Sequence, residues 1–368
     1  MAELGGESCA GRTGVSHTAK GALRHSTFGW RHGRGDHGSL KNMGEDSPVN
    51  SFLKRSWSKP AKILLASDVP ADEKTFAFAL AQSAAFGAEL IIFHATDTVA
   101  VASSDTSAIR DSDCASAARA QKHCLESLAQ RAKSIGIRCK IVVRPGMAAD
   151  QILAFLREQK IDRVVMGAHS PGPIGKLLVG SVAEAVIRNA NVPVCIVGPD
   201  VVASTYRNTE SRNILCDVST EQGRRVVASF GAELAAEQHA RLILQDIIRP
   251  QEKDKILADR TIGQIEAELL SLVPVELQDN IKVRTKVALG DPTEELLYGG
   301  RTQNASFIVL GAQGAPHFAA ITRAGIVYKV LAFAHCPVIT LSPIVLAECG
   351  AKEDKPRPSE VNYMAGVF

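Results

Sequence analysis

The sequence predicts an α/β protein built from two tandem doubly wound domains, each a five-stranded parallel sheet flanked by helices. Short apolar runs alternate with helical patterns along the chain, and this order is typical of parallel sheets with right-handed crossovers. The same order of runs begins again near Asn213. The length of 368 residues also suits two domains better than one.

The first elements follow from apolar runs and helix-ending residues. Lys62–Ala66 predicts a strand, and Asp72 begins an alanine-rich helical pattern that ends at Gly87. Leu90–Phe93 predicts the second strand, and its continuous apolar run suits a sheet covered on both faces. A polar loop from Asp97 to Ser112 separates this strand from the next helix.

The rest of the first half continues the alternation. We expect a helix to about Ile135, a third strand and a helix around Ile152, followed by a fourth strand that ends on Gly167. A loop rich in glycine, serine and proline leads to a helix that opens at Gly180-Ser181, and Pro193 ends that helix before the last strand. The third and last strands are Cys139–Val143 and Val194–Val197.

The second half repeats this order, which indicates an internal duplication of a domain of about 140 residues. The repeated strand patterns are Asn213–Asp217, Arg241–Gln245, Val283–Val287, Phe307–Gly311 and Cys336–Ile339. We place the first domain at residues 60–200 and the second at 212–343, with a polar linker at 201–211.

The two ends of the chain differ from the domains in composition. Residues 1–59 are rich in glycine, serine, histidine and arginine, and residues 344–368 are polar and contain two prolines. We expect both segments to be disordered, because they offer too little apolar surface to offset the entropy of ordering. His25, His32 and His37 could bind a metal ion, although a plain polar arm is favoured.

Composition argues against several classes of protein. A net charge of +3 without a concentrated basic face predicts no nucleic-acid partner. No apolar run reaches the roughly 18–20 residues of a membrane span, and no secretory leader is visible. The eight cysteines are scattered, which predicts reduced thiols in a cytoplasmic protein rather than disulfides or a zinc site.

An aspartate follows the first strand of each half, Asp68 in the first and Asp217 in the second. Open α/β sheets bind ligands outside the carboxyl ends of their strands, so both aspartates are candidate ligand contacts. Aspartate is also common in turns and helix caps. Both interpretations stay open at this point.

A glycine-containing loop follows the fourth strand of each half. The first reads Gly167-Ala168-His169-Ser170, then nine residues, then Gly180-Ser181; the second reads Gly311-Ala312-Gln313-Gly314, nine residues, then Ala324-Gly325. The N-terminus of the helix that follows offers unpaired N–H groups and a positive dipole end, which suit a phosphate. Small residues let the phosphate approach the backbone.

With these loops, the sequence resembles a tandem universal stress protein. Supporting marks are Asp68, Phe93-His94-Ala95, Asp162–Gly167 and Val192-Pro193-Val194, and the resemblance covers about residues 61–199 and 212–343. Nucleotide-binding members of that family carry Gly-x-x-Gly, nine residues, then Gly-Ser or Gly-Thr. The resemblance also implies that the last strands of the two domains pair with each other.

The resemblance implies an adenine-nucleotide site in the first domain. Adenine and ribose would contact Ala66, Ser67, Asp68, Ala95 and Met166, and the phosphates would contact Gly167, His169, Ser170, Gly180, Ser181 and Val182. A weaker second site would involve Asp217, Gly311, Gly314 and Gly325. Ser170 departs from the motif in the first half and Ala324-Gly325 in the second. We expect the first half to bind better, because only it keeps the Gly-Ser pair.

The predicted function is therefore a stress-response protein that binds ATP, or ADP or AMP, with Mg²⁺ as an optional companion. Nucleotide would bias the conformation shown to an unidentified protein partner; no membrane partner is expected, and a homodimer stays open. Alternatives are a nucleotide-free scaffold and a slow ATPase or phosphoryl-transfer enzyme.

No catalytic or metal-binding residue is assigned. Lys176 could reach a terminal phosphate, and His94 and His169 could lie together as a base or metal pair, but ordinary loop and backbone-bonding roles are favoured. The chain lacks the G-x-x-x-x-G-K-[ST], G-x-G-x-x-G and G-x-S-x-G fingerprints in the required contexts, which argues against P-loop enzymes, dinucleotide-dependent dehydrogenases and serine hydrolases.

Overall fold

A computed structural model gives the fold of the chain. It describes residues 57–96, 107–168, 179–207, 212–221, 223–312 and 325–350, without the side chains of 107–115 and 350. The predicted arm up to residue 56 and the tail beyond residue 350 lie outside the described residues. So do the loop residues 169–178 and 313–324.

The first domain alternates strands and helices in the predicted order. Its strands are β1 (Lys62–Ala66), β2 (Glu89–Thr96), β3 (Cys139–Pro145), β4 (Arg163–Gly167) and β5 (Val194–Val197). Its helices are α2 (Glu73–Phe86), α3 (Ser107–Ser134), α4 (Ala148–Glu158) and α5 (Ser181–Asn189). The helix α3 begins within the segment that the sequence predicts as a loop.

The second domain repeats these elements, but it has three short helices between its second and third strands, where the first domain has the single helix α3. Its strands are β6 (Asn213–Asp217), β7 (Arg241–Ile248), β8 (Lys282–Leu289), β9 (Phe307–Gly311) and β10 (Val338–Leu341). The helices shared with the first domain are α7 (Arg224–Glu237), α11 (Pro292–Thr302) and α12 (Ile326–Phe333). The three short helices are α8 (Lys253–Asp259), α9 (Ile262–Leu270) and α10 (Val275–Gln278).

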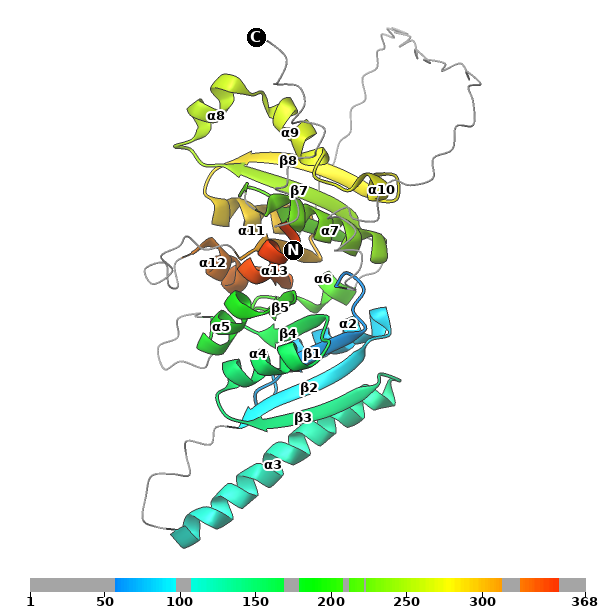
Figure 1. Ribbon diagram of the computed structural model, residues 1–368, viewed down its shortest axis with the longest axis vertical. Helices are drawn as coiled ribbons and strands as arrows, with labels where there is room; N and C mark the ends of the chain where they lie inside the picture. The colour runs from blue at the N-terminus through cyan, green and yellow to red at the C-terminus, as the bar shows by residue number, and fades with distance from the viewer. Residues whose placement is uncertain are drawn as a thin grey trace, which may run out of the picture. The chain divides into compact units, whose positions relative to one another are not determined.

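All ten strands join one sheet with the order β3-β2-β1-β4-β5-β10-β9-β6-β7-β8 (Figure 1). Neighbouring strands within each domain are parallel, whereas β5 and β10 are antiparallel, with Cys195 opposite Ile339. The Thr340 hydroxyl donates to the Val194 carbonyl oxygen at 3.2 Å across this seam. The predicted pairing of the two last strands is confirmed.

Local sequence explains where the first helix begins and ends. The Asp72 carboxylate accepts a hydrogen bond from the Thr75 backbone N–H at the N-terminus of α2. Gly87 closes the helix in a left-handed conformation, with φ of 63°. Phe76 and Phe78 of this helix are fully buried in the core.

Three expectations about the segments outside the domains need correction. Trp57 is 2% exposed, and its carbonyl oxygen accepts a hydrogen bond from buried Arg163 at 2.7 Å, so packed structure begins before residue 60. The predicted linker contains the short helix α6 (Ala203–Arg207), and its Tyr206 ring packs edge-on against Phe78. Apolar contacts order these segments despite their polar neighbours.

The third correction concerns the predicted disordered tail, because its first residues form α13 (Pro343–Gly350). Val345, Leu346 and Cys349 of this helix are buried. The helix contacts α5 of the first domain and α7 of the second. The Ser342 hydroxyl, just before it, donates to the Ala190 carbonyl oxygen at 2.5 Å. The tail therefore begins with a helix that joins both domains.

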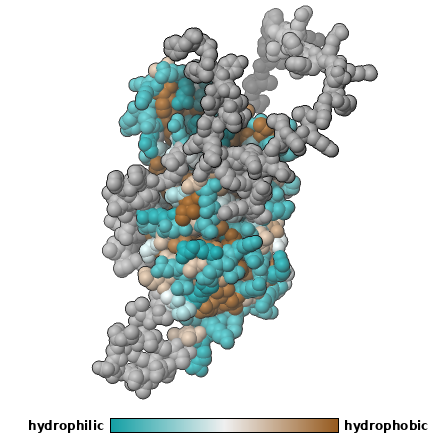
Figure 2. All heavy atoms as spheres, viewed as in Figure 1, coloured by the Kyte–Doolittle hydropathy of each residue, from teal (hydrophilic) through white to brown (hydrophobic). Residues whose placement is uncertain are grey.

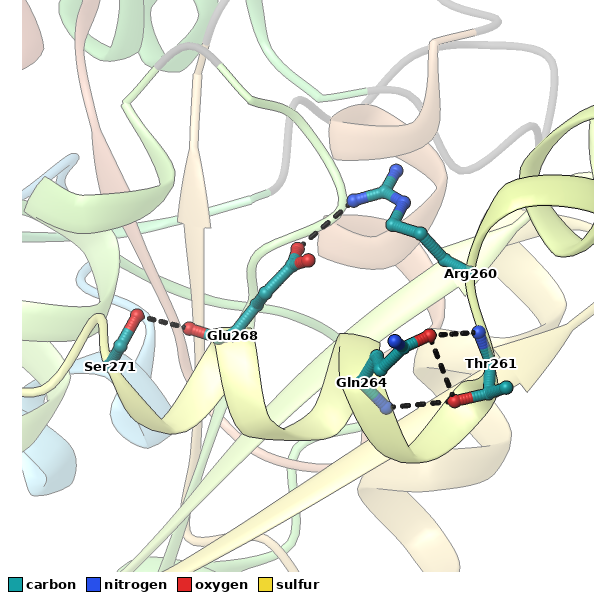
Figure 3. A network of polar contacts seen from close by, with 5 residues as sticks. All are labelled: Arg260, Thr261, Gln264, Glu268 and Ser271. Atoms are coloured by element: carbon teal, nitrogen blue, oxygen red, sulfur yellow. Dashed lines mark hydrogen bonds and ion pairs between the residues drawn. The ribbon is translucent and has the colours of Figure 1, made fainter.

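Polar contacts define the helix α9, which the sequence interpretation missed (Figure 3). Thr261 and Gln264 form a capping box at its N-terminus, and Arg260 pairs with Glu268 at 3.0 Å. The buried side chains of Ile265 and Leu269 anchor the helix to the domain. A threonine followed three residues later by glutamine, before apolar residues, was the available signal.

No disulfide joins the described cysteines, and Cys139, Cys195, Cys216, Cys336 and Cys349 are buried. Within the described ranges, no helix is both long enough and apolar enough to span a bilayer. Hydrophilic side chains cover much of the face drawn in Figure 2, with apolar areas between them.

Candidate functional site

The candidate site lies at the carboxyl ends of the parallel strands in the first domain. Its strand order, β3-β2-β1-β4-β5, reverses direction between β1 and β4. Open α/β sheets bind ligands at such a switch point. The predicted contacts Ala66, Met166 and Ala95 lie at the ends of β1, β4 and β2, so the sheet brings them to one edge.

The segment after β1 holds an unpaired carboxylate at this edge. The Ser67 backbone N–H donates to the Phe93 carbonyl oxygen at 2.9 Å, and the Ser67 hydroxyl donates to the Asp68 carbonyl oxygen at 2.8 Å. These bonds fix the backbone as it leaves the strand. The Asp68 side chain is exposed and makes no hydrogen bond or ion pair with the residues that the structure describes. It is therefore available to accept hydrogen bonds from a ligand.

His94 lies beside this turn. Its Nδ1 is 2.9 Å from the Ser67 carbonyl oxygen, so the ring holds the end of β1 against β2. The side chain is buried, and its Nε2 has no hydrogen-bond partner within the described part of the chain. His169, which the sequence analysis places near His94, lies outside the described residues.

The two ends of the first glycine loop meet above β4. The Ala168 backbone N–H donates to the Val197 carbonyl oxygen at 3.1 Å, and the Ala168 carbonyl oxygen accepts from the Gly180 N–H at 3.2 Å. The loop therefore returns to the strand end from which it left. Helix α5 begins directly after Gly180, and this N-cap glycine has no side chain that could cap the helix. Its first-turn N–H groups suit an anion.

Part of the predicted site falls on the loops themselves. His169, Ser170 and Lys176 of the first loop, and Gly314 of the second, lie outside the described residues. Of the remaining phosphate contacts, Gly180, Ser181 and Val182 lie together at the start of α5, and Gly167 ends β4. The described residues hold no group of three or more histidine, cysteine, aspartate or glutamate side chains that could bind a metal ion.

The register of the second domain corrects the predicted equivalence of Asp217 and Asp68. Asp217 pairs with Gln245 on β7, as Ala66 pairs with Phe93 on β2. Asp217 therefore occupies the position of Ala66, two residues earlier than expected. Ser219 occupies the position of Asp68. The sequence comparison aligned the two aspartates by type, whereas the strand pairing aligns the backbones.

Asp217 is also engaged in its own domain. Its Oδ1 accepts hydrogen bonds from the Ser219 backbone N–H at 3.1 Å and the Ser219 hydroxyl at 2.5 Å. Burial raises the pKa of the Asp217 carboxyl, although the bonds from Ser219 and nearby Arg249 oppose the shift. A carboxylate held in this way stabilises the turn rather than offering itself to a ribose.

The same register shows residues that the sequence interpretation missed. Asp246 and Ile247 occupy the positions of His94 and Ala95. Ile247 is 5% exposed, so a large side chain fills the place where Ala95 would border a base. Burial raises the pKa of Asp246, and the Asp217 charge adds to the shift. Extending the strand alignment to residue 247 would have found both.

The helix after the second glycine loop starts later than its counterpart. Counted back from their equivalent last caps, Ala190 and Ala334, Gly325 occupies the position of Ser181. Helix α12 begins only at Ile326, and its N-cap residue, Gly325, makes no side-chain capping bond. Glycine is a poor helix former, so the helix starts one residue later and the serine hydroxyl is lost. The second site is therefore altered at its strand ends and at its helix.

Comparison with known proteins agrees with this architecture. A model of the universal stress protein family matches residues 61–198 and 210–342, which is more than half of the chain. Two universal stress proteins of Methanocaldococcus jannaschii are 28% identical over 76 residues and 34% identical over 73 residues. These matches cover 21% and 20% of this chain, and only 47% and 43% of the relatives.

Solved structures share the fold across both domains. A universal stress protein from Archaeoglobus fulgidus has a TM-score of 0.55 at 17% identity, covering 76% of this chain and 98% of that one. A protein of unknown function from Pseudomonas aeruginosa has a TM-score of 0.54 at 14% identity, covering 82% of this chain and 99% of that one.

Proposed function

Because the chain belongs to the universal stress protein family, we propose that its first domain binds an adenine nucleotide, ATP or its products ADP and AMP, in a stress-related role. The observation that carries this proposal is that an anion site and a carboxylate, neither of them occupied by a described side chain, lie at one strand edge. The uncapped N-terminus of α5 suits the phosphates, and the unpaired Asp68 carboxylate suits the ribose hydroxyls.

The remaining contacts follow from size and polarity. Ala95 is small and half-buried on β2, and Met166 is a buried, adaptable side chain on β4, so both suit the faces of an adenine ring. Mg²⁺ would be held by phosphate oxygens and water, because the described residues provide no metal cluster of their own.

The second domain is proposed as a structural partner that binds nucleotide weakly or not at all. Ser219 replaces the free carboxylate, Ile247 fills the place of Ala95, and α12 starts one residue late. Each change removes a different contribution to binding. Nucleotide in the first domain would then bias the conformation presented to a protein partner, in the cytoplasm, where the free thiols stay reduced.

Calorimetric titration of the full chain with ATP, ADP and AMP tests this function, with native mass spectrometry of freshly purified protein as a second measurement. We expect one nucleotide per chain. Absence of binding at about millimolar nucleotide, a usual upper limit for a specific small-ligand site, would favour the nucleotide-free scaffold. Release of phosphate at a steady rate would favour the slow ATPase.

A further inference from the structure

The ten-stranded sheet has two edge strands, β3 and β8, at its opposite ends (Figure 1). An edge strand presents backbone N–H and C=O groups that no neighbouring strand uses. Proteins commonly protect such edges with charged side chains. The two edges of this sheet differ in whether their charged side chains form ion pairs with described neighbours.

The cations of β3 are neutralised by acidic neighbours. Lys140 pairs with Glu89 at 2.7 Å, and Arg144 pairs with Glu158 at 2.5 Å. The Arg144 guanidinium also lies 4.8 Å from the centre of the Phe155 ring. These contacts hold the side chains against the domain, so the β3 edge offers little free charge.

The cations of β8 have no such partners. Lys282, Arg284 and Lys286 occupy alternate positions, so they share one face of the strand. Arg241 of β7 pairs in register with Lys282 and adds a fourth cation. In the part of the chain that the structure describes, none of these four makes an ion pair; Lys286 lies 5.6 Å from the centre of the exposed Tyr298 ring.

The strand that carries this basic row is held firmly from within the domain. Val283 and Val287, on the other face of β8, pack against the hydrophobic core. Helix α9 contacts β8 and β7, and its Glu268 pairs with Arg260, the C-cap residue of α8 (Figure 3). The basic row is therefore held in place, without an ion pair to any described residue, beside a strand edge that no described strand covers.

We propose that the edge of β8 binds an acidic, extended peptide segment of a partner protein as an added strand. Alternate side chains of a strand lie about 6.6 Å apart, so acidic residues at every second position of the peptide would match the basic row. The backbone groups of β8 would bind the peptide backbone, which a nucleic acid cannot do. This site lies in the second domain and does not need nucleotide, so the two proposals can fail separately.

The test uses the full chain and a fluorescent nine-residue peptide with glutamate at every second position and valine or threonine between. Fluorescence anisotropy should show binding that weakens at least about tenfold, roughly 1.4 kcal/mol, when Arg284→Glu and Lys286→Glu are combined. Lys255→Glu, an exposed charge reversal on α8 in the same domain, should change the Kd less than about twofold. Circular dichroism checks that all variants are folded.

Two further peptides, one methylated on the odd-numbered and one on the even-numbered backbone nitrogens, separate strand addition from simple charge attraction. One of these two peptides should bind at least about tenfold more weakly, because the added strand would lose the N–H donors that face β8. Equal binding by the parent and both methylated peptides would overturn the proposal. So would no binding at millimolar peptide, or tighter binding of a single-stranded oligonucleotide, which would make the basic row a nucleic-acid surface.

Discussion

Asp68 and Ser219 occupy equivalent positions after the first strands of the two domains. The first is an exposed carboxylate without a described partner, whereas the second is a hydroxyl that binds Asp217 and accepts a hydrogen bond from the Ile247 backbone N–H at 3.0 Å. The difference at this one position separates a residue free to bind a ligand from one committed to its own turn.

Replacing Asp68 by alanine should therefore weaken nucleotide binding by about tenfold, the usual effect of losing a charged hydrogen-bond acceptor. Stability should change little, because the side chain is exposed. Calorimetric titration measures the effect. Ser219→Ala is the matched control in the second domain and should leave the Kd within about twofold. A larger loss of affinity from Ser219→Ala than from Asp68→Ala would show that the nucleotide binds in the second domain instead.

Glu233 of α7 is a second residue with a distinct environment. It is 5% exposed, it accepts a hydrogen bond from Ser58, and burial raises its pKa to about 7, with Glu237 adding to the shift. Lys59, beside Ser58, pairs with Glu237 at 3.2 Å. These contacts attach the segment before β1 to the second domain.

The raised pKa predicts a loss of stability as the pH rises. Between about 4.5 and about 7 the unfolded carboxyl loses its proton while the folded one keeps it, so unfolding becomes easier. The full effect is at most roughly 3 kcal/mol. Glu233→Gln should remove it, making the variant more stable than the parent at pH 8 but not at pH 4. Urea unfolding at both values measures this.

Glu126→Gln is the control for that comparison, because Glu126 is exposed on α3 and takes no part in the pKa shift of Glu233. Asp217 and Asp246 also have raised pKa values and contribute to the same slope in every variant. The difference between variants, rather than the slope itself, therefore reports on Glu233. The prediction would be contradicted if the difference in unfolding free energy between Glu233→Gln and the parent were the same at pH 4 and pH 8.

At the scale of elements, the alternation of apolar runs and helical patterns was enough to predict the strands and the doubly wound order. Runs such as Leu90–Phe93 are continuous because both faces of the sheet are covered. The helices between β7 and β8 were missed, since three short helices stand there in place of the single helix α3 of the first domain. Helix α13 was missed because its order comes from contacts with α5 and α7, which are distant in sequence.

The candidate site was predictable to a similar extent. The residues at the strand ends of the first domain and at the start of α5 lie where the motif implies. The second domain was misaligned at Asp217, because one shared residue type is weaker evidence than a backbone register. The replacement of Ala95 by Ile247 was missed because the strand comparison stopped at Gln245, two residues too early.

Helix α13 should contribute strongly to stability although it has only 8 residues. Removing residues 343–368 would expose the surfaces that Val345, Leu346 and Cys349 cover, at a cost of roughly 3 to 6 kcal/mol. Thermal unfolding should therefore shift to clearly lower temperature. Removing only residues 351–368 is the control and should leave the midpoint nearly unchanged. Equal midpoints for both truncations would show that the helix adds nothing.

At the scale of the whole molecule, contacts of several kinds join the two domains. The antiparallel pairing of β5 with β10 makes one sheet of both, Ser58 and Lys59 reach α7, and α13 contacts both sides. Arg188 of α5 also donates to the Tyr328 hydroxyl of α12 at 3.3 Å, so the helices after the two glycine loops touch. The domains should therefore not behave as independent units.

This arrangement predicts that the two domains unfold together. Urea titrations followed by far-ultraviolet circular dichroism and by tryptophan fluorescence should give one coincident transition. Ile339→Lys should separate the transitions, because it places an unpaired charge at a fully buried position opposite Cys195 in the seam. Ile262→Lys, an exposed position on α9, is the control and should keep one transition. Two transitions in the unaltered protein would mean that the seam carries little energy, and that nucleotide in the first domain has no route through it to the second.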